Sequence, residues 1–344
     1  GKSIICAGSP EMGQGIKTSL PMIVAEEMGA NWDDVEVVQA PEVNTELYGR
    51  QSTGGSYTLY LNWNLMREMG ATARDMFIAA AAVTLEVPRS ELKAEGSQVI
   101  HLPTGQIRTF GQLAALAHKQ PVPDKETLVF KDREDYRILG QSISQVDSLE
   151  IVTGIGDYGI DTKVPNMLYG CYVKCPAVGG TLISVNVDEI KQAPGIVDAW
   201  AIKGNGNVRE LMDGVGIVGT DTWSVFKARQ SLEIKWDKTK ASKDSWQAFS
   251  AFAEAQGQTG DKVVVDEGSV DAAFADPDHK VLSQLYEYPY VSHLCLEPMN
   301  CTADFRTDED GRDHLELWLP TQSGPRVQDM AKSRYGLEKD QVSI

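Results

Sequence analysis

Cysteine is scarce in this sequence, with only five among 344 residues. The five are widely spread and form no Cys-x-x-Cys pair, so neither a disulfide framework nor a tetrahedral zinc site is indicated. Free cysteines of this kind usually behave as small buried apolar side chains, and we expect the same here. No residue of the chain is predicted to be a metal ligand.

Long apolar runs and a surplus of positive charge are also missing. The longest aliphatic stretch, Met76–Val83, falls short of the roughly 20 residues that span a bilayer, and no signal peptide is visible. A net charge of −17 argues against a nucleic-acid groove and against docking on an anionic membrane, since both need a basic face. We therefore expect no nucleic-acid partner and no membrane span, while a local basic pocket could still hold one cofactor.

The most informative feature that is present is a glycine loop near the start. Residues Ser9–Thr18 join a short apolar run, Ser3–Ala7, to an amphipathic segment, Thr18–Met28. Two glycines and a hydroxyl side chain therefore stand at a strand-to-helix junction. The first turn of a helix has unpaired N–H donors and the positive end of the helix dipole, so this pattern predicts backbone N–H groups laid against an anionic group.

Three interpretations of this loop follow from the residues alone. A P-loop needs a glycine directly before Lys17, and because none is there, that interpretation fails. A dinucleotide-binding G-x-G-x-x-G turn fits at Gly13 and Gly15, with Glu36 near the distance expected for its acidic residue. Thr18, however, occupies the place of the third glycine, so the match is partial. A plain glycine turn between strand and helix is the alternative without a ligand.

The pattern along the rest of the chain predicts an α+β protein. We expect a long helix at Tyr57–Val83, a hairpin at Ser97–Thr109 and a short helix at Phe110–His118. Two polar stretches, Pro121–Gln145 and Asp237–Thr259, are predicted to be a linker and a mobile segment. Further strands are expected at Met167–Val173, Thr181–Val187, Val197–Ile202, Val215–Gly219, Leu232–Trp236, Lys280–Pro289, Asn300–Phe305 and Leu315–Leu319, and helices at Thr222–Ser231 and Ser323–Tyr335.

Several segments together resemble one known family. Glu11-Met12-Gly13-Gln14-Gly15-x-x-Thr18 resembles the Met-Gly-Gln-Gly loop of the molybdenum hydroxylase superfamily, the large subunits of xanthine dehydrogenase and aldehyde oxidoreductase. Gln51–Ser56 resembles that family's second cofactor loop, and Gly156–Gly170 resembles its small α/β hammerhead domain. Tyr290–Cys301 and Trp318–Gln322 resemble the start of the main cofactor-binding domain.

The order of these segments resembles one branch of the family. In xanthine dehydrogenase the hammerhead domain precedes both cofactor loops, whereas here the Met-Gly-Gln-Gly segment comes first, as in isoquinoline 1-oxidoreductase beta subunits. The resemblance implies molybdopterin-binding portions at residues 1–145 and 260–344 around a hammerhead domain at 146–240. Because the sequence opens without methionine and ends in a predicted strand, we expect it to be the N-terminal portion of a longer subunit.

The resemblance also implies a cofactor and the residues that hold it. The cofactor would be molybdopterin with molybdenum, in the cytosine dinucleotide form common in bacteria. For Ser56, capping of the long helix that follows is an alternative role compatible with phosphate binding. The residues implied to bind the cofactor are Gly13, Gln14, Gly15, Thr18, Gly54, Gly55 and Ser56.

The chemistry implied is replacement of a C–H bond beside a nitrogen or a carbonyl by C–OH, with oxygen taken from water. The family's general base is a glutamate in a Gly-x-Gly-Glu segment, but here Gly154-Ile155-Gly156 is followed by Asp157. The catalytic residues are therefore left unknown, and Glu297 is expected to be structural. We expect this chain to be inactive alone.

Since the chain has no iron–sulfur cysteine set, the resemblance implies an iron–sulfur small subunit as partner, and it allows a downstream cytochrome. The substrate would be a small N-heterocycle or aldehyde. Family members often carry an export signal, which favours a periplasmic bacterial protein over a cytoplasmic one. The alternative from a different class is a non-catalytic scaffold or interaction module that keeps the fold without the cofactor. A nicotinamide dehydrogenase would depend on the partial glycine fingerprint alone.

Overall fold

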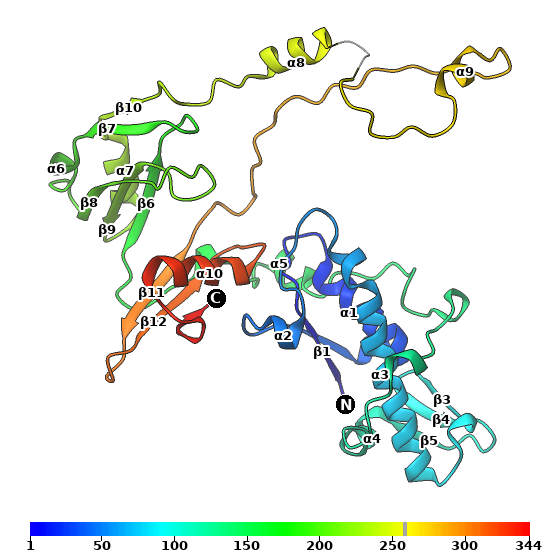
Figure 1. Cartoon of the computed structure of the whole chain (residues 1–344). Coiled ribbons are helices and arrows are strands. Elements are labelled where there is room, and N and C mark those ends of the chain that lie inside the picture. Colours follow the sequence, from blue (N-terminus) through cyan, green and yellow to red (C-terminus); the bar gives the residue numbers. More distant parts are fainter. Residues whose placement is uncertain (257–259) are drawn as a thin grey trace. The chain divides into compact units, whose positions relative to one another are not determined.

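The structure is a computed structural model that describes residues 1–256 and 260–344 (Figure 1). The chain forms two compact units. Unit 1 consists of Gly1–Lys163 and Leu296–Ile344, and unit 2 consists of Val164–Cys295. Both units contain helices and strands, which confirms the predicted α+β class.

Unit 1 begins with a β-α-β arrangement. Strand β1 (Ser3–Ala7) pairs in parallel with β2 (Val35–Gln39), and helix α1 (Ile16–Met28) connects them. A parallel pair cannot be closed by a tight turn, so the chain must cross over through a helix. The loop of interest is the connection from β1 to α1. It therefore lies at the carboxyl end of β1, where α/β folds commonly place ligands.

Helix α3 (Thr58–Leu85) confirms the long helix predicted at Tyr57–Val83. It packs on α1, and in Figure 1 the two helices lie together. Gly70 makes this approach close, because a Cβ atom there would lie 2.4 Å from the carbonyl oxygen of Val24 and 2.7 Å from the Cβ of Glu27. The crossing therefore depends on a position without a side chain.

A small antiparallel sheet follows α3. Strands β4 (Gln98–His101) and β5 (Ile107–Thr109) form the predicted hairpin, and β3 (Leu92–Glu95) adds a strand that sequence reasoning missed. Helix α4 (Phe110–Ala117) confirms the short predicted helix and starts with a capping box. Phe110 stacks on Phe77 of α3 with ring centroids 4.2 Å apart, which joins α4 to the main core.

The core of unit 1 lies between α1, α3, α4 and the small sheet. Its members are apolar residues from the inner faces of these helices and strands, with a few from the loops between them. The buried members of this cluster are Ile5, Val24, Ala25, Met28, Ala30, Ala80, Ala81, Leu92, Ala94, Val99, Phe110, Leu113, Ala117 and Ile138.

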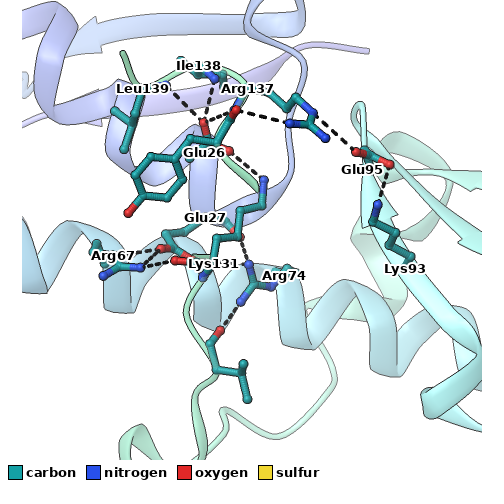
Figure 2. Close-up of polar contacts among 12 residues, drawn as sticks. Glu26, Glu27, Arg67, Arg74, Lys93, Glu95, Lys131, Arg137, Ile138 and Leu139 are labelled. Carbon is teal, nitrogen blue, oxygen red and sulfur yellow. Dashed lines mark hydrogen bonds and ion pairs between the residues drawn. The ribbon is translucent and has the colours of Figure 1, made fainter. Parts of the chain in front are cut away.

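The stretch predicted to be a linker, Pro121–Gln145, belongs instead to the body of unit 1. We call residues 129–147 the strap. Although the strap is irregular, it lies against α1 through the carboxylates of Glu26 and Glu27, both fully buried (Figure 2). The linker prediction was wrong because groups of this stretch bind two carboxylates of α1, which is far away in the sequence. Local composition does not reveal such contacts.

Glu26 and Glu27 are paired in different ways. Glu26 accepts hydrogen bonds from Lys131 Nζ at 2.7 Å and from the backbone N–H groups of Arg137, Ile138 and Leu139 at 2.8, 2.6 and 3.1 Å. The N–H of Lys131 donates to Glu27, which also forms ion pairs with two arginines of α3, Arg67 at 2.6 Å and Arg74 at 3.3 Å. Both buried charges are thus compensated, as burial requires.

The last part of unit 1 is a three-stranded sheet with one helix. Its elements confirm the strands predicted at Asn300–Phe305 and Leu315–Leu319 and the helix predicted at Ser323–Tyr335, apart from shifts of a few residues. The elements are β11 (Thr302–Thr307), β12 (Asp313–Trp318), α10 (Gly324–Tyr335) and β13 (Val342–Ser343), and unit 1 also contains the short helices α2 (Thr45–Tyr48) and α5 (Ser148–Thr153).

Unit 2 contains a three-stranded antiparallel sheet in the order β6-β9-β8 and a separate pair, β7-β10. The strands lie close to the predicted ones, and its core consists of Ile190, Ala199, Val215, Ile217, Val225 and Ala228. The elements are β6 (Tyr169–Lys174), β7 (Thr181–Val185), α6 (Val187–Ile190), β8 (Ile196–Ile202), β9 (Gly214–Gly219), α7 (Thr222–Gln230) and β10 (Ile234–Asp237).

Two predictions for unit 2 were wrong. The polar stretch Asp237–Thr259 contains a helix, α8 (Trp246–Ala255), and residues 257–259 lie outside the described part. Residues 280–289, predicted as a strand, are extended but join no sheet among the described residues. Trp246 packs edge-on against Tyr290 at 5.5 Å, and a short helix, α9 (Val270–Ala275), lies between these parts of the sequence.

Candidate functional site

The first glycine loop is organised around a carboxylate of its own. Glu11 Oε1 accepts hydrogen bonds from the N–H groups of Gly13, Gly15 and Met12 at 2.7, 3.0 and 3.1 Å, and Oε2 accepts one from Lys17 at 2.8 Å. Burial raises the pKa of Glu11, but these four donors together bring its pKa below the ordinary value of 4.5. The anion expected at the start of α1 is therefore present, and the chain itself supplies it.

The outer side of this loop stays accessible. Gly13 and Gln14 are exposed, and Gly15 is half-buried. Gly13 and Gly15 have φ values of +96° and +82°, in the region that favours glycine, and a Cβ atom at Gly13 would meet no other atom within 4 Å. The Gln14 amide folds back, with Oε1 accepting the N–H of Met12 at 2.8 Å. Gly13 and Gln14 can thus meet a ligand from outside, while the inner N–H groups are already used.

Thr18 lies in a different environment from the rest of the predicted set. Its side chain is buried, and Oγ1 accepts a hydrogen bond from the N–H of Val146 at 3.0 Å. One residue earlier, Lys17 Nζ lies 3.9 Å from a carboxylate oxygen of Asp147. In this structure, Thr18 holds the end of the strap against α1.

The second loop has the free donors that the first lacks. In the part of the chain that the structure describes, no acceptor lies within hydrogen-bond reach of the N–H groups of Gly54, Gly55 and Ser56. Gly55 and Ser56 have φ values of +63° and +59°, and a Cβ atom at Gly54 would meet nothing within 4 Å. The first turn of α3 carries no acidic residue, so the positive end of its dipole is uncompensated there.

Ser56 is not the cap of α3. The N-cap residue is Tyr57, which makes no side-chain cap hydrogen bond, and Ser56 is exposed. The helix-capping alternative for Ser56 was therefore wrong. Nearby, the buried hydroxyl of Thr58 has no hydrogen-bond partner among residues 1–256 and 260–344. An unpaired buried hydroxyl beside three free N–H groups fits a site whose ligand brings acceptors.

The fold brings the two loops together. Thr53 Oγ1 donates a hydrogen bond to the carbonyl oxygen of Pro10 at 2.8 Å, and Ser9 Oγ donates to that of Arg50 at 3.2 Å. The segment that follows β12 joins them, because the N–H of Thr53 donates to the carbonyl of Gln322 at 2.8 Å. Three segments that are far apart in the sequence thus meet at one place in unit 1.

One cavity of unit 1 lies away from the seven predicted cofactor residues. It measures about 1010 Å³ and runs along β1, α1, α3 and α4. Its lining is mainly apolar, with Val24, Leu65, Met69 and Phe77 among its residues, and includes none of the seven predicted cofactor residues. A polar, charged ligand needs donors placed to receive it, so we place the candidate site at the loops.

The described residues form no metal-binding cluster, and Glu297 bonds to neighbouring segments of unit 1. Among the described residues, no group of three or more His, Cys, Asp and Glu side chains could hold a metal ion. Glu297 Oε1 accepts hydrogen bonds from Asn300 Nδ2 at 2.9 Å and from the N–H of Ile160 at 3.3 Å. These bonds join two segments of unit 1, which agrees with the structural role expected for Glu297.

Comparison with known proteins identifies the cofactor family. Two family models described as molybdopterin cofactor-binding domains match residues 1–147 and 254–344, which together make up more than half of the chain. The chain belongs to the molybdenum hydroxylase family. The three segments that meet at the loops all lie inside these two matched regions.

Curated relatives of this chain agree with that assignment. It is 28% identical to the isoquinoline 1-oxidoreductase beta subunit of Brevundimonas diminuta over 99% of its own length and 48% of the relative's. It is 30% identical to a subunit of nicotinate dehydrogenase from Pseudomonas putida, over 92% and 26% of the two lengths. The chain thus spans less than half the length of these relatives. The matched part of the chain is of the molybdopterin cofactor-binding type.

One solved structure is also similar to part of this chain. Aldehyde oxidoreductase from Desulfovibrio gigas matches 67% of the chain with 29% of its own, at 18% identity and a TM-score of 0.37. No helix among the described residues is long and apolar enough to cross a membrane.

Sequence reasoning missed two residues that shape the site. Glu11 was read only as part of a motif, although a carboxylate shortly before a helix is a common way to satisfy the N–H groups at its start. Thr53 links the two loops, but no local sequence pattern indicates this contact, because its partner lies 43 residues away in the sequence.

Proposed function

We propose that this chain is part of the molybdenum-cofactor subunit of an enzyme that hydroxylates an N-heterocycle or an aldehyde with oxygen from water. The observation that carries the proposal is the meeting of the two glycine loops with the segment after β12 in a molybdopterin-family fold. The names of the relatives, isoquinoline 1-oxidoreductase and nicotinate dehydrogenase, support the substrate class.

The loops would hold the cofactor through two kinds of donor. Gly54, Gly55 and Ser56 would give their free N–H groups to its anionic part, helped by the dipole of α3. Gly13, Gln14 and Gly15 would contact the pterin from the outer side of the first loop, where the Gln14 amide can both donate and accept. Thr18 would act indirectly, because its buried side chain fixes the start of α1. The cytosine dinucleotide form is the one we propose.

When bound, the cofactor supplies the metal-centred oxidation, which no side chain can perform. The residues of this chain would orient it and satisfy its polar groups. The general base is not assigned to any residue of this sequence, because no Gly-x-Gly-Glu segment is present. We therefore propose that these residues alone do not support turnover.

Electrons would leave through an iron–sulfur small subunit, with a cytochrome as a further acceptor. The five cysteines support this, since their spacing provides no cluster-binding set. A periplasmic location is the proposal that the family resemblance favours. We also propose that residues 1–145 and 260–344 belong to the molybdopterin-binding part, and that 146–240 form a hammerhead domain.

The decisive experiment is metal and nucleotide analysis of the full-length protein, expressed natively with its partner. About one molybdenum per chain and release of a cytidine nucleotide on acid treatment are expected. A folded, partner-bound protein without molybdenum would instead support the scaffold alternative. Molybdenum with a different nucleotide would contradict only the dinucleotide form.

A substitution at Gly54 tests the site itself. Gly54→Asp places a carboxylate among the free N–H groups, so molybdenum per chain should fall roughly tenfold or more, the size of one lost charge-assisted hydrogen bond. Gly54→Ala is the matched control and should retain molybdenum, because its Cβ atom meets nothing within 4 Å. Equal retention by both variants would place the anionic group elsewhere.

A further inference from the structure

Between Met12 and Lys17, the side chain that accepts most of the first loop's backbone N–H groups is Glu11. The glycines of this loop adopt left-handed φ values, and apart from the start of α1 its backbone forms no regular ladder with a strand. The four N–H groups of Met12, Gly13, Gly15 and Lys17 converge on one carboxylate. Charge-assisted bonds of this kind are the strong ones, and a negative charge is favoured at the start of a helix.

We propose that Glu11 is a positioning residue, whose carboxylate serves as the built-in anion that shapes the first loop and presents Gln14 and Gly13 to the cofactor. The ordering of the loop stands on the geometry alone, whereas the part that concerns the cofactor rests on the proposed function. It follows that the two loops have different tasks: the first is closed by its own anion, and the second offers open donors.

The rival explanation is a latch, in which a cofactor phosphate displaces Glu11 from the same N–H groups. Displacement would strip the Glu11 carboxylate of its four hydrogen bonds and leave it beside a phosphate of the same charge. The free N–H groups of Gly54, Gly55 and Ser56 already provide donors that need no displacement. The two explanations predict opposite effects of removing the carboxylate.

The first arm of the test uses the full-length protein without cofactor and measures amide hydrogen exchange. In Glu11→Ala, exchange at Gly13, Gly15 and Lys17 should be at least about tenfold faster, because even one lost charge-assisted bond is of that size. Added formate should restore protection by occupying the vacated position, and chloride should not. Unchanged exchange at these amides in Glu11→Ala would overturn the proposal.

The matched control is Glu36→Ala. Glu36 lies exposed on β2, and its side chain has neither a hydrogen bond nor an ion pair among the described residues, so this variant removes an equal charge without touching the loop. Its exchange should equal that of the unchanged protein. Glu11→Gln keeps the length of the side chain but not its charge, so it is a second variant to measure if Glu11→Ala does not fold. Protection of α3 that matches the unchanged protein shows that a variant is folded.

The second arm measures molybdenum per chain in the same variants of the natively expressed protein. Positioning predicts a roughly tenfold loss in Glu11→Ala, with partial recovery in formate, whereas Glu36→Ala stays unchanged. A higher molybdenum content in Glu11→Ala would show a latch and overturn the proposal. If even the unchanged protein holds no molybdenum, the proposed function fails, and the exchange arm alone decides whether Glu11 shapes the loop.

Discussion

Glu26 shows how much one buried charge can organise. It is fully buried and accepts four hydrogen bonds, one of them from the ammonium group of Lys131. In Glu26→Gln the charge is lost and Lys131 is left without its counter-charge, so the free energy of unfolding should fall by about 3 kcal/mol. Urea denaturation of the full-length protein measures this.

Glu68→Gln is the control for that variant. Glu68 also pairs with a lysine, Lys125 at 3.0 Å, but the lysine is largely exposed. Exposed ion pairs of this type contribute at most about 1 kcal/mol to the free energy of unfolding, so Glu68→Gln should lower that free energy little. Similar losses in both variants would mean that the burial of Glu26 adds nothing.

Acid should weaken the contacts of Glu26, because protonation removes the charge of its carboxylate. Burial raises the pKa of Glu26, but the bonds from Lys131, Ile138, Leu139 and Arg137 lower it below the ordinary 4.5. A carboxyl group with a lowered folded pKa contributes its full stabilisation above the unfolded value and loses it as the pH falls further. The stability gap between the unchanged protein and Glu26→Gln should therefore be constant from pH 7 to about 5 and shrink below pH 4.5. A gap that widens in acid would contradict this.

At the scale of residues, the sequence revealed the positions of the loops but not what satisfies them. The glycines at 13, 15 and 55 could be recognised in the sequence because glycine marks tight loops. In the structure all three adopt positive φ values. The expectation of buried cysteines failed for Cys295 and Cys301, which are exposed. Contacts such as Thr53 with Pro10 depend on the tertiary fold, and no local pattern encodes them.

At the scale of elements, the crossing of α1 and α3 depends on one glycine. Gly70→Ala would place a methyl group 2.4 Å from a backbone carbonyl, so the helices must separate, and the unfolding free energy should fall by about 1–3 kcal/mol, as in overpacked cores. Thermal or urea denaturation gives the value.

Gly111 of α4 is the matched control, because a Cβ atom there meets only Thr109 Oγ1, at 4.0 Å. Gly111→Ala should stabilise the protein by up to about 1 kcal/mol, since alanine is the better helix former. An unchanged unfolding free energy in Gly70→Ala would show that α1 and α3 can accommodate a methyl group at their crossing.

Elements with strong periodicity, such as α3 and the hairpin of β4 and β5, were predicted almost to the residue. The strap was not, because its order comes from charges buried more than 100 residues away in the sequence. Residues 280–289 show the opposite error, since alternating apolar residues favour a strand but a strand needs a partner, and none pairs with them among the described residues.

At the scale of the whole molecule, unit 2 has a core of its own between the β6-β9-β8 sheet and α7. An excised fragment of residues 164–240 should therefore unfold cooperatively, with a stability of about 3–5 kcal/mol, as expected for a small single core. Circular dichroism against temperature measures it. Ile217→Ala, which empties the centre of that core, should abolish the transition. A fragment without a transition would show that this core needs the rest of the chain.

The strap has a consequence for synthesis on the ribosome. Helix α1 leaves the ribosome before the strap, with two acidic residues on the face that will be buried, and Lys131 and Ile138 lie 105 and 112 residues further on from Glu26. At about 5–20 residues per second, translation leaves α1 without these partners for several seconds or more. During that interval the nascent chain cannot complete the packing of α1 in unit 1, so a chaperone that shields α1 would act before residue 139 leaves the exit tunnel.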